Sequence, residues 1–292
     1  MTIIVPFSPG GSTDVLARLY AEHLRRITGQ NVIVDNRPGA GGTLGVQVVQ
    51  RAKPDGLTLL FDNTAFIQGA IQKTAIEYDP IGDFEAVAQV ALSPVVLGVP
   101  VTLGVSSVPE LIAHVRQSKR PLSYGSAGYG QTTHFYGEMF RQAADLDLTY
   151  VPYKGEVPFL TALIADQVSL GFATVSAMRP HLESGRLVPL AVPGTARTNL
   201  LPEVPTLGEL GFNGFEAVGW FGLLVPAGTP SQTVERLNEV ANDMLVDEKV
   251  IATLQQLALP PAHGTPAQFA EVIRNDLALW TDIVAKSGIR MP

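Results

Sequence analysis

The most chemically suggestive stretch of the sequence lies near its amino terminus, where an apolar segment runs into adjacent glycines and then into a helical pattern. Residues 3–5 are Ile-Ile-Val, Gly10 and Gly11 follow, and apolar residues recur every three or four positions from Val15 onward. Because glycine lacks a Cβ atom, a ligand can approach the backbone closely at such a loop. The first N–H groups of a helix also favour anions, since they lack intrahelical partners and lie at the positive end of the helix dipole. This stretch therefore predicts either an anion-binding loop or a tight strand-to-helix turn.

A second stretch in the middle of the chain repeats this plan. Residues 122–126 read as a short strand, glycines occur at positions 125, 128 and 130, and a helical pattern begins near residue 132. Hydroxyl and amide side chains lie between the glycines and the helix. Two helix N-termini of this kind could face each other across a cleft and hold one anion.

The candidate ligand-binding residues are therefore drawn first from these two loops. Some have a second, structural interpretation: Asp14 as a carboxylate that complements the helix dipole, Phe7 as a core residue, and His134 as a packed residue at a helix start. The first loop contributes Phe7, Ser8, Pro9, Gly10, Gly11, Ser12, Thr13 and Asp14, and the second contributes Ser126, Ala127, Gly128, Gln131, Thr132, Thr133 and His134.

Short apolar strands alternate with helical patterns in the elements that must position these loops. The first strands are predicted at 3–5, 31–35 and 57–61. This rhythm is typical of an α/β fold with a mainly parallel sheet flanked by helices. Ligands of such sheets bind beyond the carboxyl ends of the strands. Asn63 and Thr64, which follow the third strand, therefore join the candidates.

Later elements add one candidate and several helix starts. Tyr153 and Lys154 follow a predicted strand at 148–151 and could reach a binding cleft, although a solvated position is the commoner one for a lysine. Capping boxes with a proline in the first helical turn predict helix starts at 107–110, 229–232 and 265–268.

Two longer apolar strands indicate a division into two domains. They are predicted near 94–100 and 215–225, and they bracket a block of strands and helices. We expect the chain to cross between domains at these strands, which would form a hinge. Domain 1 then comprises 1–98 plus 222–292, and domain 2 comprises 99–221.

Composition excludes several classes of function. The chain has 292 residues, of which 46% are hydrophobic and 16% charged, as in a well-packed globular protein. No apolar run approaches the roughly 18 residues that a membrane span needs. The formal charge of −7, without a basic cluster, argues against nucleic acid as a partner. The absence of cysteine excludes disulfides, thiolate nucleophiles and Cys-ligated metals.

Patterns for catalysis, metals and cofactors are also missing, so we expect no cofactor and no metal. The five histidines have no metal-ligand spacing, and GxSxG and GxxxxGK[ST] motifs do not occur. Residues 128–130 begin a GxGxxG pattern, but Thr133 stands where its last glycine would be. The glycine-rich segment 38–42 is either a third anion loop or, as we favour, a structural turn.

Further motifs run in order along nearly the whole chain. They are VPFSPGGSTD at 5–14, DNRPGAGG at 35–42, PDGLTLL at 54–60, YGSAG at 124–128, His134, VPYKG at 151–155, VPT at 204–206 and GWFGL at 219–223. With these motifs the chain resembles the periplasmic solute receptors of tripartite tricarboxylate transporters, also called Bug-type binding proteins.

The resemblance implies a two-domain Venus-flytrap receptor, a monomer, that works with transporter membrane subunits in the periplasm of a Gram-negative bacterium. The amino terminus shows no signal peptide, so the residues alone leave open a cytoplasmic protein or one whose signal peptide is absent from this sequence. Family members hold a ligand carboxylate between the two loops, which correspond here to residues 7–14 and 126–134, partly through ordered water.

One departure from the family pattern bears on the ligand. The family often has an acidic residue after the strand that ends here at Ala173, whereas this chain has Thr174, which we add to the candidate site. If that acid binds an amino group, a plain carboxylate becomes a better candidate than an amino acid. We expect a non-catalytic receptor for a di- or tricarboxylate or an aromatic acid. The alternative is an α/β enzyme that uses the same loops for a phosphate or acyl substrate.

Overall fold

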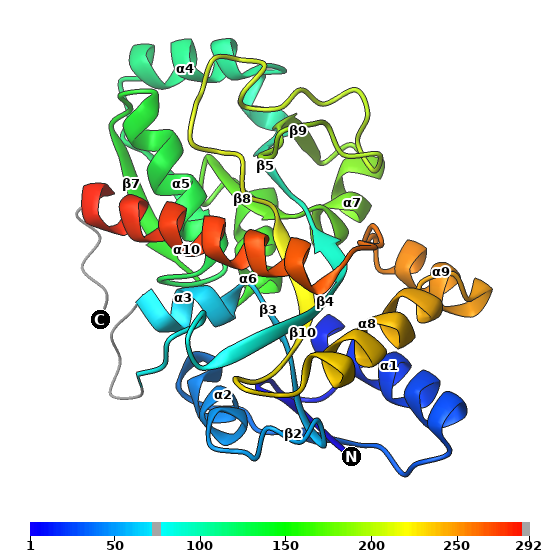
Figure 1. The fold of residues 1–292 in the computed structure, drawn as a ribbon. Coiled ribbons are helices and arrows are strands. Elements are labelled where there is room, and N and C mark those ends of the chain that lie inside the picture. The colour runs from blue at the N-terminus through cyan, green and yellow to red at the C-terminus, as the bar shows by residue number, and fades with distance from the viewer. Residues whose placement is uncertain (72–76, 288–292) are drawn as a thin grey trace. The chain divides into compact units, whose positions relative to one another are not determined.

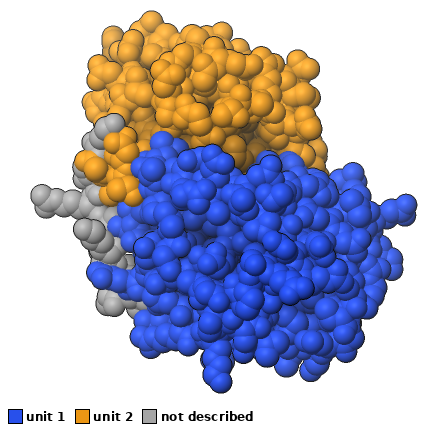
Figure 2. Space-filling view, in the orientation of Figure 1, with its two compact units in different colours: residues 1–92, 220–280 blue, residues 93–219, 281–292 orange. Residues whose placement is uncertain are grey.

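The computed structural model describes residues 1–71 and 77–287, which form two compact units (Figure 2). Unit 1 comprises Met1–Leu92 and Trp220–Trp280, and unit 2 comprises Ser93–Gly219 with the chain from Thr281 onward. Each unit is built on one five-stranded sheet. No helix among the described residues is long and apolar enough to span a bilayer.

The sheet of unit 1 has the strand order β2-β1-β3-β10-β4 (Figure 1). β1 pairs in parallel with β2 and β3, whereas β10 pairs antiparallel with β3. The carboxyl ends of β1, β2 and β3 consequently share one edge of the sheet. The strands are β1 (Thr2–Val5), β2 (Ile33–Asn36), β3 (Thr58–Asn63), β4 (Phe84–Ser93) and β10 (Gly219–Pro226).

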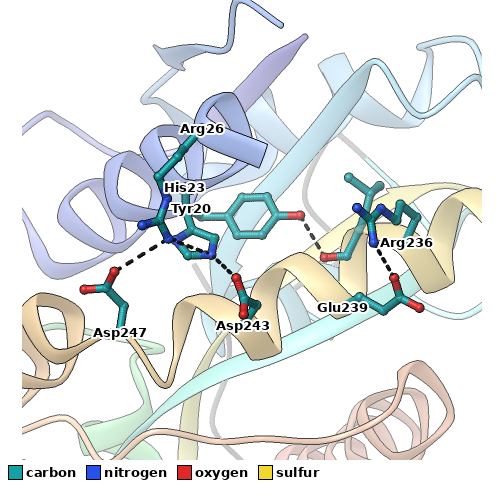
Figure 3. Close-up of polar contacts among 8 residues, drawn as sticks. Tyr20, His23, Arg26, Arg236, Glu239, Asp243 and Asp247 are labelled. Atoms are coloured by element: carbon teal, nitrogen blue, oxygen red, sulfur yellow. Dashed lines mark hydrogen bonds and ion pairs between the residues drawn. The ribbon is translucent and has the colours of Figure 1, made fainter. Parts of the chain in front are cut away.

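Helices from both ends of the chain pack on this sheet. α1 and α8 lie side by side although more than 200 residues separate them: the Tyr20 hydroxyl donates to the Leu237 carbonyl at 2.9 Å, across 217 positions, and His23 Nε2 lies 2.8 Å from Asp243 Oδ2 (Figure 3). Leu16, from the buried apolar face of α1, joins the core. The helices are α1 (Ser12–Thr28), α2 (Thr43–Gln50), α3 (Ala65–Ile71), α8 (Ser231–Met244), α9 (Glu248–Gln256) and α10 (Pro266–Ser287), with a 3₁₀ turn at Ala40–Gly42.

The sheet of unit 2 has the order β7-β6-β8-β5-β9. β6 pairs in parallel with β7 and β8, whereas β5 pairs antiparallel with β8 and β9. The strands are β5 (Val95–Pro100), β6 (Leu122–Ser126), β7 (Leu148–Pro152), β8 (Leu170–Thr174) and β9 (Leu187–Ala191). The helices are α4 (Val108–Gln117), α5 (Thr132–Ala143), α6 (Glu156–Ile164) and α7 (Val175–Glu183), with a 3₁₀ turn at Val101–Leu103.

Small residues allow close packing at the centre of unit 2. A Cβ atom on Gly171 would lie 2.4 Å from the Gly125 carbonyl oxygen and 2.5 Å from the Phe159 ring. Two glycines side by side in β6 and β8 therefore let the Phe159 ring of α6 lie directly on the sheet, and this contact fixes the start of α6 near the end of β8.

The predicted α/β class, with two sheets flanked by helices, is confirmed, although both sheets are mixed. β4 was not predicted, and β10 begins at Gly219 instead of residue 215. The hydrophobic face of β4 is interrupted by single polar residues such as Glu85 and Gln89, which hid the strand. The predicted domain limits at 98/99 and 221/222 stay a prediction; the compact units divide at 92/93 and 219/220, and residues 288–292 lie outside the described part.

The predicted capping boxes have different outcomes. The box at 265–268 is confirmed, because Thr265 Oγ1 accepts from the Gln268 N–H and Gln268 Oε1 accepts from the Thr265 N–H. The box at 229–232 is wrong: α8 starts at Ser231, and the Thr229 hydroxyl donates to the Pro226 carbonyl instead. Proline turns the chain there without a side-chain cap.

The third predicted box is confirmed with a shifted partner. Ser107 Oγ accepts from the Glu110 N–H at 3.4 Å, as expected for a cap. The Glu110 carboxylate, however, accepts from the N–H of Ser106 at 2.8 Å, one residue before the cap.

Candidate functional site: the two glycine loops

The first glycine loop lies at the carboxyl edge of the parallel strands of unit 1. It connects β1 to α1, and residues 8–11 are exposed. Gly10 has a φ of 92°, which favours glycine. Gly11 has a φ of −78° and precedes α1 as its N-cap residue, with no side-chain hydrogen bond to the helix start. The first N–H groups of α1 therefore begin at an exposed loop without a side-chain cap.

The Asp14 carboxylate stabilises the first glycine loop through hydrogen bonds. Its carboxylate accepts from the Gly10 N–H at 3.0 Å, from Arg18 through two nitrogens at 2.9 and 3.0 Å, and from Asn36 Nδ2 at 2.9 Å. These four donors fill the usual acceptor capacity of a carboxylate, and the residue is only 3% exposed. Burial alone would raise the pKa of Asp14, but the hydrogen bonds from Arg18, Gly10 and Asn36 together lower it. Asp14 is thus positioned to organise the loop.

The other side chains predicted for this half of the site are also held within unit 1. Asn63 Nδ2 donates to the Thr13 hydroxyl at 3.1 Å, and the Thr64 hydroxyl accepts from the Trp220 N–H at 2.9 Å. Phe7 is partly buried against the core, and its carbonyl accepts from Asn36 Nδ2 at 3.0 Å. The exposed surface of the loop consequently consists of Ser8, Pro9, Gly10 and Gly11.

The neighbouring glycine segment 38–42 has the geometry of a structural turn. Gly39, Gly41 and Gly42 have φ values of 139°, 67° and 104°, and Ala40 has 47°. A backbone of this kind requires glycine at several positions. This requirement accounts for the glycines without an anion, in line with the interpretation that we favoured.

The second glycine loop lies at the corresponding edge of unit 2. It connects β6 to α5, and it is tied to the β7–α6 loop because the Ser126 carbonyl accepts from the Tyr153 N–H at 3.2 Å and the Ala127 carbonyl from the Gly155 N–H at 2.8 Å. Gln131, in an extended conformation, precedes α5 without a side-chain cap on the helix. Tyr153 is partly buried, and its ring lies 6.0 Å from that of Phe159.

The buried Ser126 hydroxyl stabilises the second glycine loop through hydrogen bonds. Its hydroxyl donates to the Gly128 carbonyl at 3.1 Å, accepts from the Gly128 N–H at 3.3 Å and lies 2.8 Å from the Tyr150 hydroxyl. One donor and two acceptor positions are all that a hydroxyl has, and the residue is fully buried. Thr133 acts similarly, since its hydroxyl accepts from the Ala127 N–H at 3.4 Å.

His134 supports the same loop as a neutral ring. Its Nδ1 accepts from the Gly130 N–H at 3.2 Å, so the ring proton lies on Nε2. The imidazole stacks on Tyr150 with ring centroids 4.0 Å apart and contacts Tyr129 at 4.7 Å. Burial lowers the pKa of His134 to about 4, which keeps the ring uncharged at neutral pH.

Thr174 lies at the end of β8, beside the start of α6. Its hydroxyl accepts from the Ala177 N–H at 3.3 Å and from the Ser176 hydroxyl at 3.0 Å, and it donates to Glu156 Oε2 at 3.0 Å. The hydroxyl therefore caps α7 and is fully engaged. The residue contacted by Thr174, Glu156, was not among the predicted site residues.

Sequence reasoning missed four side chains that organise the two loops. Asn36 and Arg18 hold Asp14, Tyr150 stacks on His134, and Glu156 binds Thr174. Asn36 belongs to the DNRPGAGG motif and Arg18 stands four residues after Asp14, so both left a signal in the sequence. Tyr150 and Glu156 become partners of the loop only through strand pairing.

Four helix starts at the two sheet edges share one property. α1, α2, α5 and α6 all follow parallel strands and begin without a side-chain cap, whereas α7, which follows β8, is capped by Thr174. Away from these edges, α4 and α9 are capped by Ser107 and Asp247, and α8 begins without a side-chain cap. No group of three or more metal-ligating side chains occurs within the described residues. Uncapped helix N-termini beside glycine loops suit the binding of an anion.

Comparisons with known proteins agree with this chemistry. The sequence model of the tripartite tricarboxylate transporter family receptor matches residues 16–289. Among curated proteins, the UPF0065 protein in the tcbD-tcbE intergenic region of Pseudomonas sp. (strain P51) is 33% identical over 98% of this chain and 85% of its own length. Protein BugT of Bordetella pertussis is 31% identical over 99% of this chain and 89% of its own.

Solved structures give the same result. R. palustris Rpa4515 with adipate is 34% identical with a TM-score of 0.81, covering 99% of this chain and 97% of that one. The periplasmic binding protein BugD is 30% identical with a TM-score of 0.79 and coverages of 99% and 97%. MatC (Rpa3494) from Rhodopseudomonas palustris with bound malate is 29% identical with a TM-score of 0.78 and coverages of 97% and 98%. The chain therefore belongs to the tripartite tricarboxylate transporter receptor family, whose members are solute-binding receptors and not enzymes.

Proposed function

We propose that this protein is an extracytoplasmic receptor that binds a small organic carboxylate and delivers it to the membrane subunits of a tripartite transporter. In this proposal the protein acts in the periplasm as a monomer. The ligand carboxylate is bound by N–H groups at the start of α1 and of α5, beside the two glycine loops. The ligand thus contacts one loop from each unit, and its binding favours whichever arrangement of the units allows both contacts.

One observation carries the proposal: the buried side chains that support the two loops are engaged within their own unit, while the helix starts are uncapped. Asp14, Ser126 and Thr174 have filled hydrogen-bonding capacity, so an anion at the helix starts meets backbone N–H groups with a helix dipole behind them. The formal net charge of the whole chain is −7, so an anion has to be attracted by groups close to the site and not by the overall field of the protein.

The comparisons support the carboxylate as the ligand class. Two of the related structures are those of Rpa4515 with adipate and of MatC with bound malate, and both ligands are small carboxylates. Both related proteins cover nearly the full length of this chain. Adipate and malate are therefore the first probes for this protein.

A thermal-shift screen of a carboxylate library tests the proposal. A ligand present at about 100 times its Kd should add roughly 2.7 kcal/mol to the free energy of unfolding. The best ligand is then incubated with stoichiometric protein and followed by mass spectrometry, where we expect it unchanged. If no carboxylate stabilises the protein, or if the ligand is converted, the proposed function is wrong.

A further inference from the structure

Glu156 is a carboxyl group at the edge of unit 2 that no part of the proposed carboxylate contact uses. It is the first residue of α6 and is partly buried. Its Oε1 accepts from the Thr174 N–H at 2.5 Å and its Oε2 from the Thr174 hydroxyl at 3.0 Å. No ion pair joins Glu156 to a lysine or arginine within the described residues. Burial raises the pKa of this carboxyl above its usual value, which is the mark of a desolvated acid without a cation.

The position of Glu156 places it with the second glycine loop. Gly155, the preceding residue, donates its N–H to the Ala127 carbonyl of that loop at 2.8 Å. On its other side, Glu156 reaches the end of β8, the strand that pairs with β6. The carboxyl group therefore lies at the same sheet edge as the start of α5, among the loops that follow β6, β7 and β8.

Glu156 retains acceptor capacity that Thr174 lacks. The Thr174 hydroxyl donates once and accepts twice, so it has no position left for a ligand. A carboxylate offers about four acceptor positions, of which Thr174 occupies two. Because the residue is also partly exposed, Glu156 is the member of the Glu156–Thr174 pair that keeps acceptor positions for a ligand.

We propose that Glu156 sets the specificity of the receptor, by accepting a hydrogen bond from a hydroxyl or ammonium group of the ligand and by repelling a second carboxylate at the same position. This inference rests on the proposed function and narrows it. The preferred ligand is a small hydroxy- or amino-carboxylate, whose carboxylate binds at the helix starts and whose donor group reaches Glu156. Selection by repulsion is as effective as selection by attraction, since specificity is a difference between two affinities.

The alternative role for Glu156 is a latch that only ties α6 to β8. Glu156→Gln separates the two roles, because glutamine keeps an acceptor oxygen for the Thr174 N–H and loses the charge. Four series of acids with three to six carbons serve as probes: unsubstituted acids, ω-hydroxy acids, ω-amino acids and α,ω-dicarboxylates. Their affinities are measured by isothermal titration calorimetry on the full chain.

We expect the wild-type protein to bind the best hydroxy or amino acid at least tenfold more tightly than the dicarboxylate of equal length. In Glu156→Gln this ratio should fall at least tenfold. If the affinity ratio falls further for amino acids than for hydroxy acids, the donor group of the ligand is an ammonium. If the ratio falls equally for both, the donor group is a hydroxyl. Glu203→Gln removes the same charge from an exposed position of unit 2, so it should keep the wild-type ratio.

Two results would overturn the inference: a wild-type preference for dicarboxylates, or an unchanged ratio in a Glu156→Gln protein that melts like the wild type. If Glu156→Gln fails to fold, Glu156→Asp replaces it. The aspartate side chain is shorter by one methylene, so its carboxylate lies farther from the ligand. An unchanged affinity ratio in Glu156→Asp would also contradict the proposal. Binding of dicarboxylates alone leaves the receptor function standing. Absence of binding across all four series also overturns the inference, whereas the receptor function is decided by the screen of the carboxylate library.

Discussion

The two glycine loops follow the same local plan but are supported by different chemistry. In unit 1 an ionised group, Asp14, gathers a guanidinium, an amide and a loop N–H. In unit 2 the support is neutral: the Ser126 hydroxyl and the uncharged His134 ring hold the loop, with Tyr150 packed between them. A strand–glycine–helix pattern thus fixes the path of the backbone, while the means of holding it depends on residues brought in from other strands and helices.

The difference predicts that the two supports respond to acid at different pH values. The pKa of His134 is about 4 in the folded chain, against an ordinary value near 6.5. Between these pH values His134 is protonated in the unfolded state and neutral in the folded state. The stabilisation of the folded state by neutral His134 is therefore present above pH 6.5 and is lost as the pH falls through 4. The loss amounts to as much as about 3 kcal/mol. The pKa of Asp14 is lowered, so Asp14 keeps its charge over this window.

Urea unfolding at several pH values measures this effect. In His134→Asn the amide oxygen can replace Nδ1 as an acceptor without titrating, so the loss between pH 6.5 and 4 should shrink. Asp276 in unit 1 acts in the opposite sense, because burial raises its pKa to about 6, and its contribution is lost as the pH rises through that value. Both tryptophans, Trp220 and Trp280, belong to unit 1, so their fluorescence reports that unit while circular dichroism reports both. Identical acid profiles for wild type and His134→Asn would contradict the neutral support.

The first loop also offers a direct test of backbone recognition. Gly11 has an ordinary φ, and no atom lies within 4 Å of the position that an added Cβ would take, so valine should fit the folded chain. The positive φ of this loop belongs to Gly10, so Gly11→Val strains no left-handed backbone. Gly11→Val should nevertheless weaken ligand binding at least a hundredfold, about 2.7 kcal/mol, because its side chain lies where the carboxylate approaches the N–H groups.

Gly208→Val is the matched control for this test. Gly208 is exposed and has no left-handed φ, and its closest neighbour to an added Cβ is Thr206 Oγ1 at 3.7 Å. It should bind like the wild type, and both variants should melt within a few degrees of it. A stable Gly11→Val protein with normal affinity would show that the start of α1 does not hold the anion.

Removing the charge at Asp14 should lower the free energy of unfolding, by somewhat less than the binding free energy that Gly11→Val loses. Asp14→Asn leaves Arg18 without its carboxylate and replaces an acceptor at the Gly10 N–H, and hydrogen bonds to charged groups contribute about 1.5–3 kcal/mol. Because Arg18 is 52% exposed and can be solvated, we expect about 2 kcal/mol, with weaker ligand binding as the loop loosens. Glu22→Gln on the exposed face of α1 should change neither quantity. Equal losses for the two variants would mean that Asp14 contributes only charge to the helix.

Much of the fold and the location of the loops could be predicted because they depend on local patterns. The apolar runs of β1 and β6, the glycines after them and the amphipathic helices are all visible within a dozen residues. The side chains that support the loops could not be predicted, because Glu156 contacts Thr174 and Tyr150 contacts His134 only when β6, β7 and β8 pair. Thr174 by itself gave no sign that α6 supplies a carboxyl to this corner from another segment.

The smallest expected effect concerns Ser126, for which the sequence alone favoured a hydrogen bond to the ligand. The hydroxyl is buried and its donor and acceptors are used by Gly128 and Tyr150. Ser126→Ala should therefore cost about 1 kcal/mol in the free energy of unfolding and change the ligand Kd by less than about threefold. Ser123→Ala, on the same strand, provides the control for shortening a serine in β6. Calorimetry and urea unfolding of the two variants separate the roles: a tenfold weaker Kd with unchanged stability would show that Ser126 contacts the ligand, and that the second loop binds through a side chain where the first uses its backbone.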